Sequence, residues 1–217
     1  AGQRLAGVLR RELSRDNNVV LGLPRGGLPV AYDVAMALEA PLDVMVVRKL
    51  GAPFNPELAI GAVAAGGLTV YNEAVLRHLE LSKADVGDVL ERESAELRRR
   101  ERIYRGDRPF PVLKGKTVIL VDDGIATGAT MEAAVEAVRA MDPAGIVVAV
   151  PTAAHESVAR IERSADRVVA LAMPEPYLAV GASYEYFPQL RDADVIELLE
   201  SAWSRDCLLY TSDAADE

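Results

Sequence analysis

Residues 118–130 carry the clearest chemical signal in the chain, because two adjacent carboxylates precede a turn of small and hydroxyl residues. The stretch reads VILVDDGIATGAT. Its apolar start indicates a buried strand, so Asp122 and Asp123 should lie beyond the carboxyl end of that strand, where open α/β sheets bind ligands. The turn leads into a helix that should begin near Ala129. Backbone N–H groups and the helix dipole favour an anion at such a turn.

Two hydroxyl side chains add hydrogen-bond donors to the same turn. Thr127 and Thr130 could both donate to a bound anion. Phosphate donors and two carboxylates within a few residues suit a sugar phosphate with free hydroxyls. The alternative is an acidic turn between a strand and a helix, such as the pocket of a receiver-type domain. There the acidic pair normally follows the first strand, whereas here it follows several.

This stretch resembles the defining pattern of the type I phosphoribosyltransferases, an apolar strand, two acidic residues and a loop ending in TG-x-T. The resemblance implies that Asp122 and Asp123 hold the ribose hydroxyls of phosphoribosyl pyrophosphate (PRPP). It also implies that they bind Mg²⁺ indirectly, through the ribose or through water. The residues that match the loop binding the 5′-phosphate are Ala126, Thr127, Gly128, Ala129 and Thr130.

A second loop, GLPRGGLP at residues 22–29, follows the first predicted strand. Glycines allow the backbone to approach a ligand closely, and Arg25 supplies a charge for an anion. In the resembled family the loop at this point binds pyrophosphate, and the matching residues here are Pro24, Arg25, Gly26 and Gly27. The alternative is a plain turn between a strand and a helix with a solvated arginine.

Further cations are expected around the pyrophosphate. Arg48 and Lys49 should end the second strand and face the same crevice. The family often has a pyrophosphate-contacting basic residue there, although an ordinary solvated pair would have the same sequence. The resemblance implies that Arg25 and Lys49, together with Mg²⁺, stabilise the leaving pyrophosphate.

A highly charged helix is predicted from Ser82 to Arg105, with Ser82 and Asp85 forming a capping box. It occupies the interval in which the family has its flexible catalytic loop, so its arginines could close over a bound pyrophosphate as a lid. A solvated helix face with ion pairs between successive turns is the alternative. The candidate lid residues are Arg99, Arg100, Arg102 and Arg105.

The segment from Tyr177 to Leu190 supplies four aromatic side chains in a loop. Enzymes of the family that act on 6-oxopurines have a Val-Gly and a later Tyr-Phe here, where a ring stacks on the base. The matching residues are Val180, Gly181, Tyr186 and Phe187, with Tyr177 as a further base-binding candidate. The spacing is shorter than in those enzymes, and Pro188 replaces their arginine. Ala126 stands at the position where those enzymes have their acidic general base. The adenine enzymes of the family also have alanine there, so the general base is unidentified.

Strands that alternate with helices must position these loops, which predicts a mostly parallel sheet covered on both faces. Strands are predicted at residues 18–21, 42–47, 117–121, 146–150 and 168–171, and two shorter ones within 59–70. Helices are predicted at residues 30–38, 131–141, 156–164 and 193–203. The expected architecture is α/β, the type I phosphoribosyltransferase fold with about five strands, a hood built from chain-terminal segments and a helical lid insertion.

Composition excludes several classes of protein. The net charge of −9 argues against a nucleic-acid binder with a broad basic face, and no apolar run approaches the roughly 20 residues that a membrane span needs. One cysteine and no recognisable signal peptide favour a cytoplasmic protein. The Gly115-Lys116-Thr117 triplet lacks the first glycine of a Walker A motif. His78 and His155 have no partners at metal-ligand spacing.

Both ends of the chain look artificial. Ala1 opens directly into a helical pattern, which predicts a truncated N-terminus. The last residues, CLLYTSDAADE, resemble a translated sequencing adapter. We therefore expect a phosphoribosyltransferase domain over residues 1–206 and a non-native tail over 207–217. Leu208, Leu209 and Tyr210 should then continue no helix or strand and make few buried contacts.

The implied reaction transfers ribose 5-phosphate from PRPP to a nucleobase-type acceptor, for example a purine, with release of pyrophosphate. The expected partners are PRPP and a small nucleobase-like acceptor, with a second copy of the chain as a candidate partner in a homodimer. No helix-turn-helix or basic stripe marks a nucleic-acid partner. The alternative is a non-catalytic or regulatory protein of the same fold that binds PRPP or a nucleotide.

Overall fold

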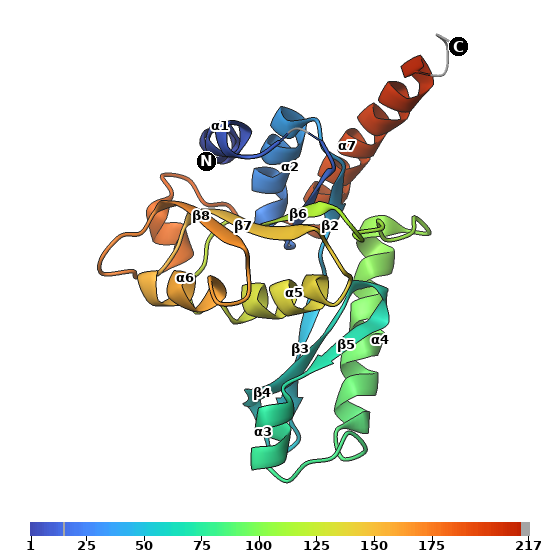
Figure 1. The fold of residues 1–217 in the computed structure, drawn as a ribbon, viewed down its shortest axis with the longest axis vertical. Coiled ribbons are helices and arrows are strands. Elements are labelled where there is room, and N and C mark those ends of the chain that lie inside the picture. Colours follow the sequence, from blue (N-terminus) through green and yellow to red (C-terminus); the bar gives the residue numbers. More distant parts are fainter. Residues whose placement is uncertain (15, 214–217) are drawn as a thin grey trace.

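A five-stranded parallel sheet forms the centre of the protein (Figure 1). The computed structural model describes residues 1–14 and 16–213, without the side chains at 57 and 206–213. The strand order is β2-β1-β6-β7-β8, and every neighbouring pair is parallel. The strands are β1 (Asn18–Gly22), β2 (Leu42–Val44), β6 (Thr117–Val121), β7 (Gly145–Thr152) and β8 (Arg167–Ala172). The predicted sheet is confirmed.

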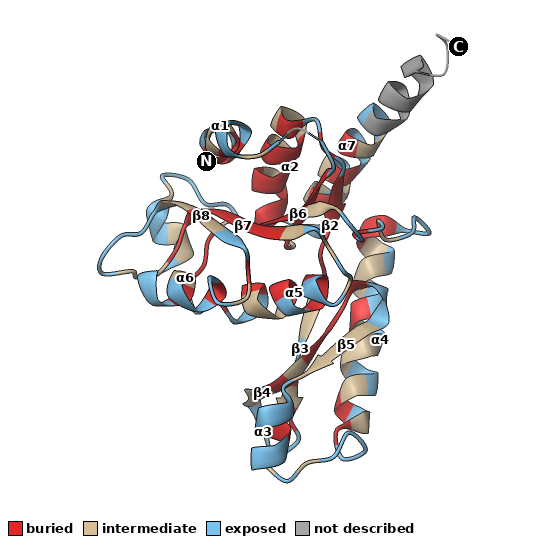
Figure 2. Ribbon diagram, viewed as in Figure 1, coloured by how far each residue is buried: buried red, intermediate tan, exposed pale blue. Residues whose placement is uncertain are grey.

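Helices cover both faces of this sheet, which explains why its strands are almost continuously apolar. Helices α1 (Gly2–Glu12), α2 (Gly27–Leu38) and α7 (Asp192–Asp213) lie on one face, and α5 (Ala129–Arg139) and α6 (His155–Ile161) on the other (Figure 1). Because side chains alternate along a strand, Val20 packs with the first group of helices and Val19 with the second. Figure 2 shows burial concentrated on the sheet and on the helix faces turned toward it.

A second, antiparallel sheet is inserted after β2. Its strands β3 (Val47–Ala52), β4 (Asn55–Ala64) and β5 (Leu68–Tyr71) lie in the order β3-β4-β5. The two strands predicted within 59–70 are confirmed, and the turn η1 (Ala65–Gly67) joins them with Gly66 at a φ of 77°. The second strand of the parallel sheet was predicted over residues 42–47 but ends at Val44, because residues 47–52 form a separate strand that pairs with β4.

Two helices complete the insertion, α3 (Glu73–His78) and α4 (Gly87–Arg105). The predicted helix start at Ser82 is wrong. The capping-box bonds do form, with the N–H of Ser82 donating to Asp85 Oδ2 (2.8 Å), but they close a turn, and the helix begins at Gly87. Helix α4 packs on β3 and α7, with Leu97 and Tyr104 buried, so its inner face is fixed.

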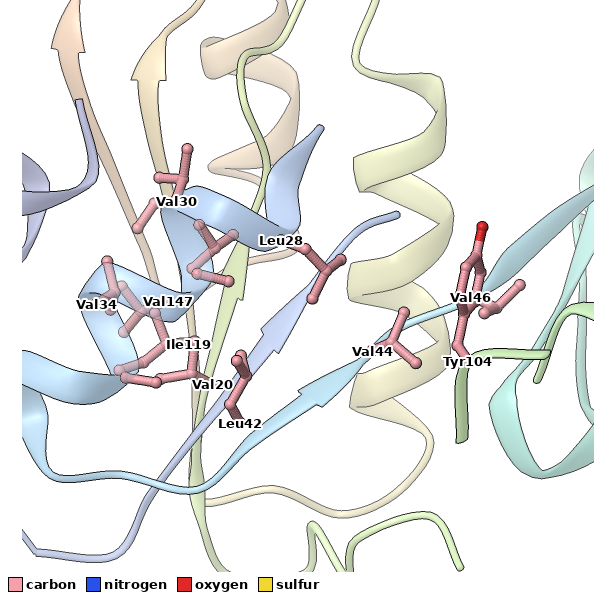
Figure 3. Packing of buried hydrophobic residues seen from close by; sticks show 14 of the residues in the cluster. Val20, Leu28, Val30, Val34, Leu42, Val44, Val46, Tyr104, Ile119 and Val147 are labelled. Atoms are coloured by element: carbon pink, nitrogen blue, oxygen red, sulfur yellow. The ribbon is translucent and has the colours of Figure 1, made fainter. Parts of the chain in front are cut away.

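One hydrophobic cluster joins the insertion to the main sheet. It includes Val20 and Ile119 of the sheet, Val34 of α2 and Leu97 of α4. Figure 3 shows how it continues through the chain segment that leaves β2 toward Tyr104. The insertion therefore shares its core with the parallel sheet.

The last helix is longer than predicted. Its backbone runs from Asp192 to Asp213, beyond the expected end at Trp203 and through Leu208 to Tyr210, which were expected to continue no helix. No glycine or proline follows Trp203 to stop it. The predicted lack of buried contacts in residues 207–217 concerns side chains outside the described residues.

No helix within the described residues is both long enough and apolar enough to cross a membrane.

Candidate functional site

Two loops meet at the carboxyl edge of the parallel sheet. Strands β1 and β6 are neighbours in register, with Gly22 opposite Val121, so the turns that follow them lie side by side. The N–H of Leu23 donates to the carbonyl of Val121 (2.9 Å) and ties the two turns together. Sheet register thus brings the predicted pyrophosphate loop next to the predicted acidic pair.

The contact between these loops requires two glycines. A Cβ on Gly26 would stand 1.7 Å from Asp123 Oδ2, and a Cβ on Gly27 would stand 2.7 Å from the carbonyl oxygen of Val121. No side chain larger than hydrogen fits there without displacing the neighbouring atoms. Its glycines were expected to let the backbone of this loop approach a ligand closely. In the structure they let it approach the acidic pair.

Asp122 and Asp123 lie in poorly hydrated surroundings. Burial and the neighbouring charge of Asp123 raise the pKa of Asp122 well above its ordinary value, and burial likewise raises the pKa of Asp123. The N–H of Asp123 donates to Asp122 Oδ1 (2.9 Å). Such carboxylates favour ligands that supply positive charge or hydroxyl donors.

These oxygens also fit a magnesium ion that keeps much of its own water. Mg²⁺ is usually held by one or two carboxylates together with substrate phosphates. Within the described residues, no group of three or more acidic, histidine or cysteine side chains could form a complete metal cage. Asp122 and Asp123 would suffice for an ion held mainly by its substrate.

The predicted phosphate loop ends in an open helix start. Gly128, with a φ of 77°, precedes α5, and Thr127 and Thr130 are exposed. Among the described residues, none accepts a hydrogen bond from the backbone N–H groups of 127–130. The first bond into the helix runs from the N–H of Glu132 to the carbonyl of Gly128 (2.9 Å). Free N–H groups at the positive end of a helix can bind an anion.

A hollow of about 630 Å³ lies between the acidic pair and the loop after β8. Arg25 and Asp123 line it together with Tyr186 and Phe187, two of the three base-binding candidates. Tyr177 does not line it. Tyr177 lies instead beside the phosphate loop, in a separate hollow shared with Ala126 and α6, because the chain leaving β8 first passes α6.

Sequence reasoning did not single out Tyr184. Its hydroxyl donates to the backbone carbonyl of Asp123, and its ring centroid lies 5.0 Å from that of Phe187. Burial and the charges of the acidic pair raise the pKa of Tyr184, so the phenol stays protonated and remains a donor. Its place among four aromatics was the only sequence signal for this contact.

A third hollow, of about 380 Å³, collects cations from distant parts of the chain. Arg25 lines it with Arg99 and Arg100 of α4, two of the candidate lid residues. Both α4 arginines donate to Glu96, and these hydrogen bonds lower the pKa of Glu96 to about 2. Three guanidinium groups thus line one hollow, and two of them are paired with Glu96.

Asp192, which no sequence pattern singled out, lies in the same hollow. The hydroxyl of Tyr104 donates to Asp192 Oδ1 (2.7 Å), and Arg25 Nη1 lies 4.0 Å from the same oxygen. Burial and this hydrogen bond raise the pKa of Tyr104 to about 12. Asp192 therefore links the arginine-rich hollow to the start of α7.

Arg105 is not a lid residue. Its side chain is 4% exposed, and its guanidinium pairs with Asp43 of β2 (3.0 Å) and donates to the carbonyl of Val44 (2.9 Å). Helix α4 turns this position toward the parallel sheet, whereas Arg102 remains exposed. The lone aspartate in the apolar run of β2 was the sequence signal for a buried cation partner.

The expected placement of Arg48 and Lys49 is also wrong. Both belong to β3 of the second sheet, because the chain leaves the parallel sheet after β2. They line a hollow of about 310 Å³ that Arg25 and Asp123 do not share, and Arg48 pairs with Glu93 (2.6 Å). The structure does not bring these two cations to the acidic pair.

Comparisons with known proteins identify similar sequences and a similar solved structure. The sequence matches the family model of the phosphoribosyl transferase domain over residues 1–185. Two Mycobacterium tuberculosis proteins, named "Putative phosphoribosyl transferase Rv0571c" (strain ATCC 25618 / H37Rv) and "Putative phosphoribosyl transferase MT0597" (strain CDC 1551 / Oshkosh), are each 47% identical over 202 residues. The match covers 93% of this chain but only 45% of theirs, so the chain spans less than half the length of these relatives.

A solved structure is similar over nearly its whole length. The crystal structure of TT1426 from Thermus thermophilus is 45% identical to this chain, with a TM-score of 0.84. The similarity covers 91% of this chain and 93% of TT1426. Sequence and fold therefore agree across both the parallel sheet and the insertion.

Proposed function

Because the chain belongs to the phosphoribosyl transferase domain family, we propose that it transfers ribose 5-phosphate from PRPP to a nucleobase-type acceptor. The observation that supports this most directly is the junction of Gly26 and Gly27 with Asp122 and Asp123. It places a backbone loop suited to pyrophosphate against two carboxylates suited to ribose hydroxyls. The open start of α5 follows the carboxylates and completes a site for the two ends of PRPP.

Each part of PRPP has a matching group in this proposal. The 5′-phosphate accepts hydrogen bonds from the free N–H groups and hydroxyls of residues 127–130. Asp122 and Asp123 accept hydrogen bonds from the ribose hydroxyls. Arg25 holds the pyrophosphate, and Arg99 and Arg100 extend the positive field from α4.

Transfer makes a bond from an acceptor nitrogen to C1′ as the bond from C1′ to pyrophosphate breaks. Positive charge then grows on the ribose, and the carboxylates of Asp122 and Asp123 stabilise it. Arg25 stabilises the negative charge that grows on the leaving group. Mg²⁺, held by pyrophosphate oxygens and indirectly by the acidic pair, would supply further positive charge there.

The acceptor in this proposal is a flat aromatic base, for example a purine, because the hollow next to Asp123 is lined by Tyr186 and Phe187. Phe187 is 45% exposed and Tyr186 is 81% exposed, so both rings offer free faces for stacking. Ala126 supplies no acid or base. The acceptor proton must therefore pass to a group other than residue 126.

The test combines binding with turnover. Calorimetry with PRPP and Mg²⁺ should give saturable binding, and a panel of purine and pyrimidine bases should reveal one that releases pyrophosphate. Binding without turnover on any base would support the regulatory alternative. Absence of PRPP binding at millimolar concentration would contradict both functions.

A further inference from the structure

Two side chains of α6 hold the phosphate loop from the side opposite its free N–H groups. Ser157 Oγ donates to the carbonyl of Ala126 (2.6 Å), and Arg160 Nη2 donates to the carbonyl of Thr127. Ser157 is only 3% exposed. Both contacts reach across about 30 residues of sequence to two successive peptide groups of the loop.

The geometry of a trans peptide gives these contacts their significance. The carbonyl of one residue and the N–H of the next point in opposite directions within one rigid plane. A carbonyl of Ala126 held toward α6 therefore directs the N–H of Thr127 away from α6. The carbonyl of Thr127, held by Arg160, directs the N–H of Gly128 the same way.

Arg160 is itself fixed at both sides. Its Nε donates to Glu132 Oε1 on α5 (2.8 Å), and its Nη2 lies 3.3 Å from Ser157 Oγ. Gly128 leaves little room for the loop to shift, because a Cβ there would stand 3.2 Å from the Cβ of Ser157. The positive charge of the Arg160 guanidinium also lies beside the loop, and the carboxylate of Glu132 partly offsets it.

We propose that Ser157 and Arg160 are positioning residues for the 5′-phosphate site, which they keep ready by fixing the peptide planes on both sides of Thr127. This inference rests on the proposed function, since it assigns the phosphomonoester end of the ligand to this loop. It predicts a difference between ligands. Ligands that carry a 5′-phosphate depend on both residues, whereas inorganic pyrophosphate, held near Arg25, does not.

The experiment compares the Arg160→Met and Ser157→Ala variants of the full chain with wild type, using ribose 5-phosphate and inorganic pyrophosphate as calorimetric probes with Mg²⁺. Arg160→Met should bind ribose 5-phosphate about tenfold more weakly, the scale of one charge-assisted hydrogen bond. Ser157→Ala should weaken it several-fold. Pyrophosphate affinity should stay within about twofold of wild type for both.

Two further variants separate positioning from general stability. Arg163→Met removes an exposed arginine just beyond the same helix and should bind both probes as wild type does. Arg160→Lys keeps a donor and should recover part of the lost ribose 5-phosphate affinity. With an active acceptor base, Arg160→Met should raise KM for PRPP more than it lowers kcat.

The outcomes distinguish this inference from the proposed function. Selective loss of ribose 5-phosphate binding supports it. If wild type binds ribose 5-phosphate and Ser157→Ala and Arg160→Met both bind it equally well, the inference is wrong while the proposed function stands. Equal weakening of both probes also overturns it, because it would indicate a general distortion. A wild-type protein that binds neither ribose 5-phosphate nor PRPP overturns both.

Discussion

Gly26 lies so close to Asp123 that a methyl group on Gly26 would overlap the carboxylate, with Cβ 1.7 Å from Oδ2. The Gly26→Ala variant must therefore move either the loop or the acidic side chain. We expect it to weaken PRPP binding at least tenfold, as measured by calorimetry, while circular dichroism shows an intact fold. The matched control is Gly7→Ala on α1, where a Cβ meets nothing within 4 Å. Unchanged affinity in Gly26→Ala would show that the ligand does not use this junction.

Asp123→Asn keeps the size of the side chain but removes its charge. If the carboxylate stabilises positive charge that grows on the ribose, kcat should fall by well over tenfold, and the Kd of PRPP should change less. Pyrophosphate release under saturating PRPP measures the first quantity. Asp107→Asn, in an exposed turn after α4, is the control. A rate equal to wild type would show that the transition state does not use the charge of Asp123.

Asp122→Asn should stabilise the protein at neutral pH. The folded-state pKa of Asp122 is raised by burial and by the charge of Asp123. The carboxyl's contribution to stability is therefore fully present below its unfolded pKa of about 4, and is lost as the pH rises through the folded value.

Removing the charge should consequently raise the melting temperature at pH 8 by a few degrees, at about 2–4 °C per kcal/mol for a chain of this size. The gain should shrink toward pH 5. Differential scanning calorimetry across this range measures it, and the same gain at every pH would contradict the assignment. The stabilised variant should nevertheless bind PRPP more weakly.

Arg105→Met should destabilise the fold by about 3–5 kcal/mol, because it leaves the buried carboxylate of Asp43 without its cation. Urea unfolding gives the free energy directly. Arg102→Met, three residues earlier and exposed, should change stability by less than about 0.5 kcal/mol. Adding Asp43→Asn to Arg105→Met should restore part of the loss, and a further loss instead would mean that the pair is not the cause.

Local pattern was sufficient for several features that depend on neighbours in sequence. The strand at 117–121, the acidic pair and the glycine-rich loop before α2 are all properties of short segments, and the parallel register of β1 and β6 then brings them together. The predicted α/β fold followed from the alternation of such segments. The positions of cationic side chains were harder to predict. A charged helix has the same sequence pattern whether one of its arginines faces solvent or a buried aspartate.

Arg105 illustrates the limit, since its partner Asp43 lies 62 residues away and faces it only after α4 has packed on the sheet. The exit of the chain from the parallel sheet after β2 likewise moved Arg48 and Lys49 into another sheet, and no residue type marks that exit. Ser157 and Arg160 support the phosphate loop from a different βα unit. The contacts of Ser157 and Arg160 with that loop have no local sequence signal.

The wall of the hollow beside Tyr186 and Phe187 includes Ala1 and Gly2. An affinity tag fused ahead of residue 1 would therefore emerge next to the aromatic side chains, where it could compete with an acceptor and lower its apparent affinity. Protein for binding assays should have such a tag removed. The same proximity offers a reporter, because a fluorophore attached just ahead of Ala1 would sense occupancy of the hollow without any substitution in its lining.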